Sequence, residues 1–174
     1  VALITGGASG IGFAVAAQLG RAGYMVAVLG RNTQSGRQAA TALCDLGIDA
    51  VGDGADFSNY AEVASLRERL GPLSEPEILV CSAGVMSEKM SKTLRTAPDE
   101  WDRVLGVNVM GVVNALAHFA PPMVAARSGK VIALSACLGR FSGPGTSGGL
   151  APYRVSKAAV NALIRNFAAE TGWG

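Results

Sequence analysis

A short apolar run that ends in a cluster of glycines is the feature that most constrains this chain. Residues 1–5 are mostly apolar and end at Thr5, glycines follow at Gly6, Gly10 and Gly12, and a helical pattern begins directly afterwards. A strand, a glycine turn and a helix in this order direct the helix N-terminus and free backbone N–H groups at a phosphate. A Cβ atom would hold a pyrophosphate away from the backbone. A tight turn in an α/β domain is the alternative interpretation, and later segments must decide between the two.

Apolar runs and amphipathic stretches alternate along the whole chain. The apolar runs lack polar alternation, as expected for parallel strands buried on both faces. Expected strands cover residues 1–5, 24–29, 48–51, 77–81 and 130–134, and expected helices cover residues 11–22, 33–46, 59–70, 98–120 and 151–171. This alternation predicts an α/β fold, a Rossmann-type doubly wound parallel sheet with helices on both faces, which binds ligands at the carboxyl ends of its strands.

The length and composition predict one domain. The 174 residues suffice for one core, and 49% hydrophobic against 16% charged residues excludes a disordered chain. We therefore expect a single domain over residues 1–174, and the glycine turn suggests that it binds a dinucleotide. Because the sequence begins inside the first strand and stops after a helical pattern, we expect a fragment or a protein that lacks a C-terminal part.

Charge and cysteine content exclude several classes of protein. A net charge of +2 without a basic run argues against a nucleic-acid partner, and no apolar run approaches membrane-spanning length. Cys44, Cys81 and Cys137 show neither a pairing pattern nor metal-ligand spacing. We therefore expect reduced thiols, a cytoplasmic protein and no metal site. The one histidine, His118, is expected to be a packed helix residue.

Three further motifs follow the glycine turn. Cys81-Ser-Ala-Gly84 lies at an expected strand end, and Asn108-Val-Met-Gly111 and Tyr153-Arg-Val-Ser-Lys157 lie on expected helices. Together with the Gly-x-x-x-Gly-x-Gly spacing of the first turn, they resemble the classical short-chain dehydrogenase/reductase family over essentially the whole chain. The resemblance implies an NAD(P)-dependent oxidoreductase that interconverts a small-molecule carbonyl and a secondary alcohol. It also implies that this chain lacks the C-terminal strands and the substrate-binding segment of the family.

The resemblance also implies how the cofactor is held. Arg31 follows Gly30, the position where NAD-dependent relatives usually carry a carboxylate. A guanidinium can form two hydrogen bonds to a 2′-phosphate, so Arg31 favours NADP(H) over NAD(H). The alternative is that Arg31 is a solvated residue at the start of a loop. Asp56 is implied to contact the adenine amino group, with Phe57 beside the ring. Capping of the following helix by Asp56 or Ser58 is the alternative. The implied cofactor-binding residues are Gly6, Ser9, Gly10, Ile11, Gly12, Arg31, Asp56, Phe57, Ser82, Ala83, Gly84, Tyr153 and Lys157.

Tyr153 and Lys157 lie four residues apart, so their side chains leave one face of a helix. A free phenol has a pKa of about 10 and is a poor acid or base near neutral pH. A nearby ammonium favours the phenolate. The resemblance implies that Tyr153 is the acid/base, that Lys157 lowers its pKa and binds ribose, and that Asn108 links Lys157 to solvent through water. An exposed helix pair and an ordinary satisfied Asn are the alternatives.

One departure from the family pattern occurs after the fifth expected strand. The family usually has two serines there, the second orienting the substrate carbonyl, whereas this chain has Ser135 and Ala136. Ser135 is not expected to substitute, because adjacent strand side chains point to opposite faces. Candidate replacement hydroxyls in the following loop are Ser142, Thr146 and Ser147. Losing one such donor costs on the order of 10²–10³ in rate. A catalytically silent nucleotide-binding sensor or scaffold is therefore the alternative function.

Two further expectations concern partners and chemistry. The resemblance implies a homodimer or homotetramer formed through the expected helices at residues 98–120 and 151–171. No nucleic acid and no membrane are expected as partners. A methyltransferase on a related fold is disfavoured, because it would give Tyr153 and Lys157 no role.

Overall fold

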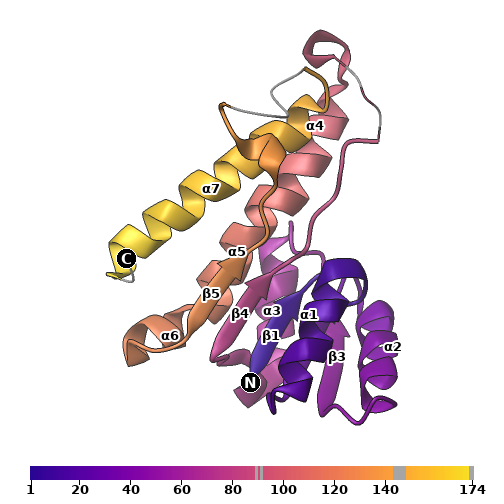
Figure 1. Ribbon diagram of the computed structural model, residues 1–174, viewed down its shortest axis with the longest axis vertical. Helices are drawn as coiled ribbons and strands as arrows, with labels where there is room; N and C mark the ends of the chain where they lie inside the picture. The colour runs from indigo at the N-terminus through magenta and orange to yellow at the C-terminus, as the bar shows by residue number, and fades with distance from the viewer. Residues whose placement is uncertain (89, 91, 143–147, 173–174) are drawn as a thin grey trace.

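A computed structural model describes residues 1–88, 90, 92–142 and 148–172, and its centre is a parallel sheet covered by helices on both faces (Figure 1). The strands are β1 (Ala2–Thr5), β2 (Val26–Gly30), β3 (Ala50–Gly54), β4 (Ile78–Cys81) and β5 (Lys130–Ala133). They are ordered β3-β2-β1-β4-β5, and each pair of neighbours is parallel. The strand order reverses at β1, so the carboxyl ends of β1 and β4 flank the switch point where such sheets bind ligands.

Each sheet face has its own layer of helices. One face packs against α1 (Gly10–Arg21) and α2 (Thr33–Cys44). The opposite face packs against α3 (Tyr60–Leu70), α5 (Gly111–Phe119), α6 (Pro121–Ala126) and α7 (Ala151–Thr171). Successive strand residues alternate between the layers, as the period of two requires: Leu3 lies in the α5 layer and Ile4 in the α1 layer.

A long helical rod runs beside α7 (Figure 1). It consists of α4 (Pro98–Leu105), the π-helical turn η3 (Gly106–Met110) and α5. Short 3₁₀ turns complete the fold: η1 (Gly71–Ser74), η2 (Thr93–Arg95) and η4 (Cys137–Gly139). Helix α4 begins with a proline in its first turn and carries acidic residues there, both of which favour a helix start.

The predicted Rossmann-type parallel sheet is confirmed, and most expected elements begin and end within two residues of the observed ones, but two elements differ more. The third strand was expected at residues 48–51 and lies at Ala50–Gly54. Gly52 and Gly54 are poor strand formers, but they pair with β2, so the strand extends through them. The helix expected at residues 98–120 is interrupted by η3, and α6 follows at once because proline is tolerated in a first turn. The helix expected at residues 151–171 is confirmed.

Helix α2 lies directly on β3 through glycine contacts. A Cβ atom at Gly36 would overlap the backbone of Asp53, and one at Gly52 would overlap the backbone of Gly36. A Cβ at Gly54 would meet the backbone of Asn32, the N-cap residue of α2. No side chain separates the two backbones here, so the N-terminus of α2 is held close to the carboxyl ends of β2 and β3.

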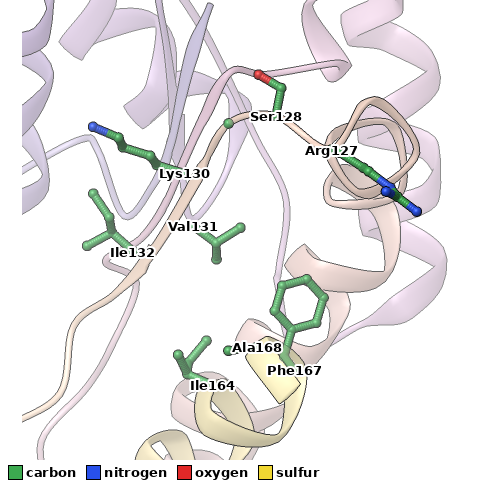
Figure 2. Close-up of a pocket in the computed structure, with 9 residues that line it drawn as sticks. Arg127, Ser128, Lys130, Val131, Ile132, Ile164, Phe167 and Ala168 are labelled. Carbon is green, nitrogen blue, oxygen red and sulfur yellow. The ribbon is translucent and has the colours of Figure 1, made fainter. Parts of the chain in front are cut away.

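The outer edge of β5 borders a groove against α7 (Figure 2). Within the described residues, no strand pairs with this edge. Val131 points toward Ile164 and Phe167 of α7, whereas Lys130 and Ile132 point away. The side chain of Ile132 is 47% exposed. The groove lies away from the glycine turn, at the opposite side of the sheet order from β3.

Candidate active site

A cleft of about 550 Å³ opens at the carboxyl ends of the strands. It is lined by residues that follow β1, β2, β3, β4 and β5, so it spans the sheet at the predicted position. It brings together most of the residues expected to bind a cofactor, namely Gly6, Ser9, Gly10, Ile11, Arg31, Asp56, Phe57, Ser82, Ala83 and Gly84. Gly12, Tyr153 and Lys157 are not among its lining residues.

The glycine turn leaves its backbone open to the cleft. Gly6 and Gly10 have positive φ angles of 65° and 54°, which favour glycine. A Cβ at Gly6 would lie 2.6 Å from the Ala83 nitrogen, and one at Gly12 would overlap the Gly6 carbonyl. Nothing lies within 4 Å of where a Gly10 Cβ would be. Gly6 and Gly12 are therefore needed for packing, and Gly10 keeps backbone exposed on the cleft side.

Helix α1 begins at this turn with its first amides available. Its N-cap, Ser9, is extended (φ −161°, ψ 171°), and its side chain makes no capping hydrogen bond. The first N–H groups of a helix have no intrahelical acceptor, and the helix dipole favours an anion beside them. Since Ser9, Gly10 and Ile11 all line the cleft, a pyrophosphate fits at this end of α1.

The residues expected near adenine lie in the cleft with local partners. Asp56 accepts hydrogen bonds from the amide of Ser58 (2.9 Å) and its hydroxyl (2.7 Å). Neither residue caps α3: the cap is Asn59, whose Oδ1 accepts from the amides of Ala61 (3.0 Å) and Glu62 (3.3 Å). Both capping alternatives for Asp56 and Ser58 were therefore wrong, because Asn59 adjoins the first helical residue and fits the N-cap better.

Phe57 is a core residue as well as a lining residue. Its side chain is 5% exposed and packs in the α3–α5 layer. Its carbonyl accepts a hydrogen bond from Nδ2 of Asn114 (2.8 Å), a buried residue of α5. Its contribution to the cleft is thus constrained by packing, and the contact with an adenine ring stays a prediction.

Lys157 is buried in the first turns of α7 beside Tyr153. It is 6% exposed, and its Nζ donates to the Leu134 carbonyl (2.8 Å) after β5. The same atom lies 5.7 Å from the centre of the Tyr153 ring. Burial lowers the pKa of the Lys157 ammonium, because a charge is less well solvated there. A Cβ at Gly84 would lie 3.6 Å from this Nζ, which places Lys157 at the β4 end of the cleft.

Asn108 sits in the π-helical turn and fixes the segment after β4. Its Oδ1 accepts from the Val85 amide (2.7 Å), and its Nδ2 donates to the Val85 carbonyl (2.9 Å) and to Ser156 Oγ (2.9 Å). Ser156 Oγ donates in turn to the Tyr153 carbonyl (2.7 Å). π-Helical turns recur at functional sites. The structure brings Asn108 to the Tyr153–Lys157 turn, and the water relay stays a prediction.

Ser156 is a residue that sequence reasoning missed. It is fully buried and joins Asn108 to the backbone of Tyr153. A signal was available, since a serine hydroxyl in a helix commonly bonds a carbonyl one turn earlier. Its bond to Asn108, 48 residues away, could not be deduced locally.

Ser135, the neighbour of Ala136, contacts the backbone of α7, and that it does not replace the missing serine stays a prediction. Its hydroxyl donates to the Lys157 carbonyl (3.3 Å), so it is engaged with the α7 backbone. Gly139 of η4 also lies against α7, where its Cβ would be 2.7 Å from the Lys157 carbonyl carbon. Of the candidate replacement hydroxyls, Ser142 is exposed, and Thr146 and Ser147 lie outside the described residues.

The other reactive side chains have structural explanations. Burial raises the pKa of the Cys81 thiol to about 12, so this residue at the end of β4 is not a thiolate near neutral pH. His118 is buried on α5, and its ring centre lies 4.4 Å from that of Tyr60. It is the packed helix residue that was expected. In the part of the chain that the structure describes, no helix has the length and apolar character to span a membrane.

The parallel sheet, with a cleft at its switch point and an exposed glycine backbone beside it, defines a Rossmann-type fold. A family model described as "short chain dehydrogenase" matches residues 1–173. The chain therefore belongs to the short-chain dehydrogenase family, whose members are NAD(P)-dependent oxidoreductases.

Individual relatives agree with this assignment. The chain is 37% identical over 175 residues to "Glycine betaine reductase ATRR" of Emericella nidulans. That match covers 98% of this chain and 13% of the relative. It is 33% identical to "3-oxoacyl-[acyl-carrier-protein] reductase FabG" of Staphylococcus aureus, covering 97% of this chain and 67% of the relative. A crystal structure of a 3-oxoacyl-[acyl-carrier protein] reductase with bound NAD from Brucella melitensis has 31% identity and a TM-score of 0.86. That match covers 98% of this chain and 65% of the crystallised one.

Proposed function

We propose that this protein is an NADP(H)-dependent oxidoreductase that interconverts a carbonyl and a secondary alcohol. The observation that carries the proposal is the buried Lys157 ammonium, which lies beside Gly84 of the cleft wall and 5.7 Å from the centre of the Tyr153 ring. Transfer of deuterium from 4-deuterated NADPH to a ketone tests it directly.

The chemistry divides between cofactor and chain. A bound nicotinamide supplies or accepts the hydride. Tyr153 donates a proton to the carbonyl oxygen, or takes one from the alcohol in the reverse direction. The Lys157 ammonium favours the phenolate form of Tyr153 and donates to a ribose hydroxyl. The Leu134 carbonyl fixes the Lys157 side chain, and Asn108 with Ser156 fixes the turn that carries Tyr153. Burial lowers the pKa of Lys157, so its ammonium loses its proton at a lower pH than that of an exposed lysine. Activity is therefore expected to fall with rising pH at that lower pH.

The preference for NADP(H) rests on Arg31 and on the space at Gly30. Arg31 is exposed and lines the cleft after β2. A Cβ at Gly30 would overlap the Ser35 hydroxyl and lie 2.7 Å from the Gly36 nitrogen. A carboxylate that accepts from ribose hydroxyls therefore has no room at position 30. A guanidinium at position 31 suits a 2′-phosphate instead.

Replacing Arg31 with Ala is expected to weaken NADPH binding by about 10- to 100-fold, since a hydrogen bond to a charged group contributes roughly 1.5–3 kcal/mol. NADH binding should change by less than about threefold, because NADH lacks the phosphate. Fluorescence titration of both nucleotides measures this. Arg21→Ala, in the last turn of α1, is the matched control. Equal weakening of NADPH and NADH would contradict the assignment.

The alternative, a nucleotide-binding sensor or scaffold without turnover, is favoured by Ala136. Replacing Ala136 with Ser is expected to raise kcat by about 10- to 100-fold with unchanged NADPH affinity, because it restores a donor for the developing oxyanion. Steady-state kinetics with a ketone panel measures this, and Ala133→Ser, on β5, is the control. Undetectable turnover in both the parent and Ala136→Ser proteins, with intact NADPH binding, would support the sensor.

We also propose a homodimer through α5 and α7. Support comes from an apolar groove of about 590 Å³ between these helices. Its walls include Val113, Leu116, Val124, Leu163 and Phe167. A second copy that covers this groove would remove apolar surface from water.

A further inference from the structure

We infer that Glu100 and Arg103 of α4 form a positioning pair for the substrate, which holds residues 85–88, with the apolar residue Met86, where the segment leaves the wall of the cleft at Val85. This inference rests on the proposed oxidoreductase function. It assigns to the same site a substrate whose carbonyl carries an apolar substituent.

The pair binds the backbone of the segment that follows the cleft. Nε and Nη2 of Arg103 lie 2.8 and 3.0 Å from the two carboxylate oxygens of Glu100. Arg103 Nη2 also donates to the Met86 carbonyl (2.8 Å). Glu100 Oε1 accepts from the Glu88 amide (2.7 Å). One ion pair therefore satisfies both a carbonyl and an amide of the segment, and charge-assisted bonds of this kind are the stronger ones.

The same segment is anchored at its other end by Asn108, through the amide and carbonyl of Val85. Val85 and Gly84 line the cleft, and Gly84 lies beside Lys157. The position of residues 85–88 is thus set from α4 and η3, on both sides of Met86. A shift at Glu100 or Arg103 is transmitted to the wall of the cleft near the reacting groups.

The segment also approaches the start of the helix that carries Tyr153. The Met90 methyl lies 3.5 Å from where a Cβ of Gly149 would be, and Arg154 Nε donates to the Gly149 carbonyl (2.8 Å). Met86 and Met90 are 56% and 73% exposed. Met86, on the segment that the pair holds, and Met90, beside the start of the helix that carries Tyr153, are adaptable exposed apolar side chains that fit an apolar group of the substrate.

Stability does not explain the pair well. The Arg103 side chain is 35% exposed, and ion pairs near the surface contribute little to folding free energy. Arg103 makes three hydrogen bonds, two to Glu100 on its own helix and one to the Met86 carbonyl. These bonds restrict where residues 85–88 can lie. A positioning role predicts effects on substrate selection and on local backbone exchange, with little effect on unfolding.

The test uses the Arg103→Ala, Glu100→Gln and Arg103→Lys variants, with acetophenone and acetone as the apolar and small probes. In Arg103→Ala, the ratio of kcat/KM for acetophenone to that for acetone is expected to fall about tenfold, mainly through KM for acetophenone. NADPH Kd should stay within about twofold, and Arg103→Lys should recover part of the ratio. Amide hydrogen exchange of residues 85–88 should become faster in Glu100→Gln, which weakens the acceptor for the Glu88 amide. Arg21→Ala is the control.

Three outcomes would overturn the inference: an unchanged substrate ratio, unchanged exchange at residues 85–88, or an equal fall in both substrates that tracks lost thermal stability. Failure of the proposed function looks different. In that case the parent protein transfers no hydride to either ketone, while hydrogen exchange still reports whether the pair holds the segment. The proposed role of the pair in substrate selection is then rejected together with the proposed function. Hydrogen exchange of residues 85–88 alone then decides whether the pair holds this segment.

Discussion

Replacing Tyr153 with Phe is expected to lower kcat by about 10²–10⁴-fold, because the change removes the only proton that the proposed acid/base can donate. The ring, the helix and the neighbouring Ser156 bond to the Tyr153 carbonyl all remain. NADPH Kd should therefore stay within about threefold. Steady-state kinetics with ketone and NADPH measures kcat, and fluorescence titration measures Kd.

The matched control for this prediction is Tyr60→Phe. Tyr60 is 60% exposed, lies at the start of α3 and contacts the His118 ring, a contact that phenylalanine keeps. Tyr60→Phe should leave both kcat and Kd unchanged. If Tyr153→Phe retained the parent kcat, Tyr153 would not be the acid/base, and a sensor that binds nucleotide would become the better account.

Replacing Gly36 with Ala is expected to lower the free energy of unfolding by about 1–3 kcal/mol, the usual effect of overpacking. Two effects compete here. Ala is a better helix former than Gly by about 1 kcal/mol, which alone would stabilise α2. The new Cβ, however, would overlap the backbone of Asp53 on β3, and backbone cannot rotate away as a flexible side chain can. The overlap with the Asp53 backbone therefore outweighs the gain in helix propensity, and the free energy of unfolding falls.

Urea denaturation followed by circular dichroism measures this change, with Gly106→Ala as the control. Gly106 has helical angles, and its Cβ would lie at an ordinary 3.5 Å from the Ser58 Cβ. That variant should be neutral or slightly stabilising. If Gly36→Ala were as stable as Gly106→Ala, the direct contact of α2 with β3 would be wrong, and so would the restriction it places on position 30.

Local sequence signals predicted the sheet and the cleft well, because parallel strands and glycine turns leave local patterns. The apolar runs located four strands closely and the third strand in part, and the glycine turn located a wall of the cleft, where Gly6 and Gly10 lie. Lys157 was predicted to lie near Tyr153 from helical spacing alone, and its side chain does so. The helical period is enough for that inference, since i and i+4 share a face.

What could not be predicted depends on contacts between distant segments. The shift of β3 to Ala50–Gly54 follows from pairing with β2, and the π-helical turn at Asn108 is accompanied by its bonds to Val85 and Ser156. Arg103 and Glu100 read as an ordinary helix pair until the Met86 carbonyl is placed beside them. Burial likewise decides the pKa direction of Lys157, and the sequence does not show burial.

The central claim is that this chain positions a hydride donor against a carbonyl and supplies the proton. The most direct measurement uses NADPH carrying deuterium at both hydrogen positions of nicotinamide C4, a panel of ketones and mass spectrometry of the products. Deuterium is expected on the carbinol carbon of the product alcohol, at a rate that falls about 10²–10⁴-fold in Tyr153→Phe. Tight NADPH binding with no deuterium in any alcohol, in parent and Ala136→Ser proteins alike, would contradict it.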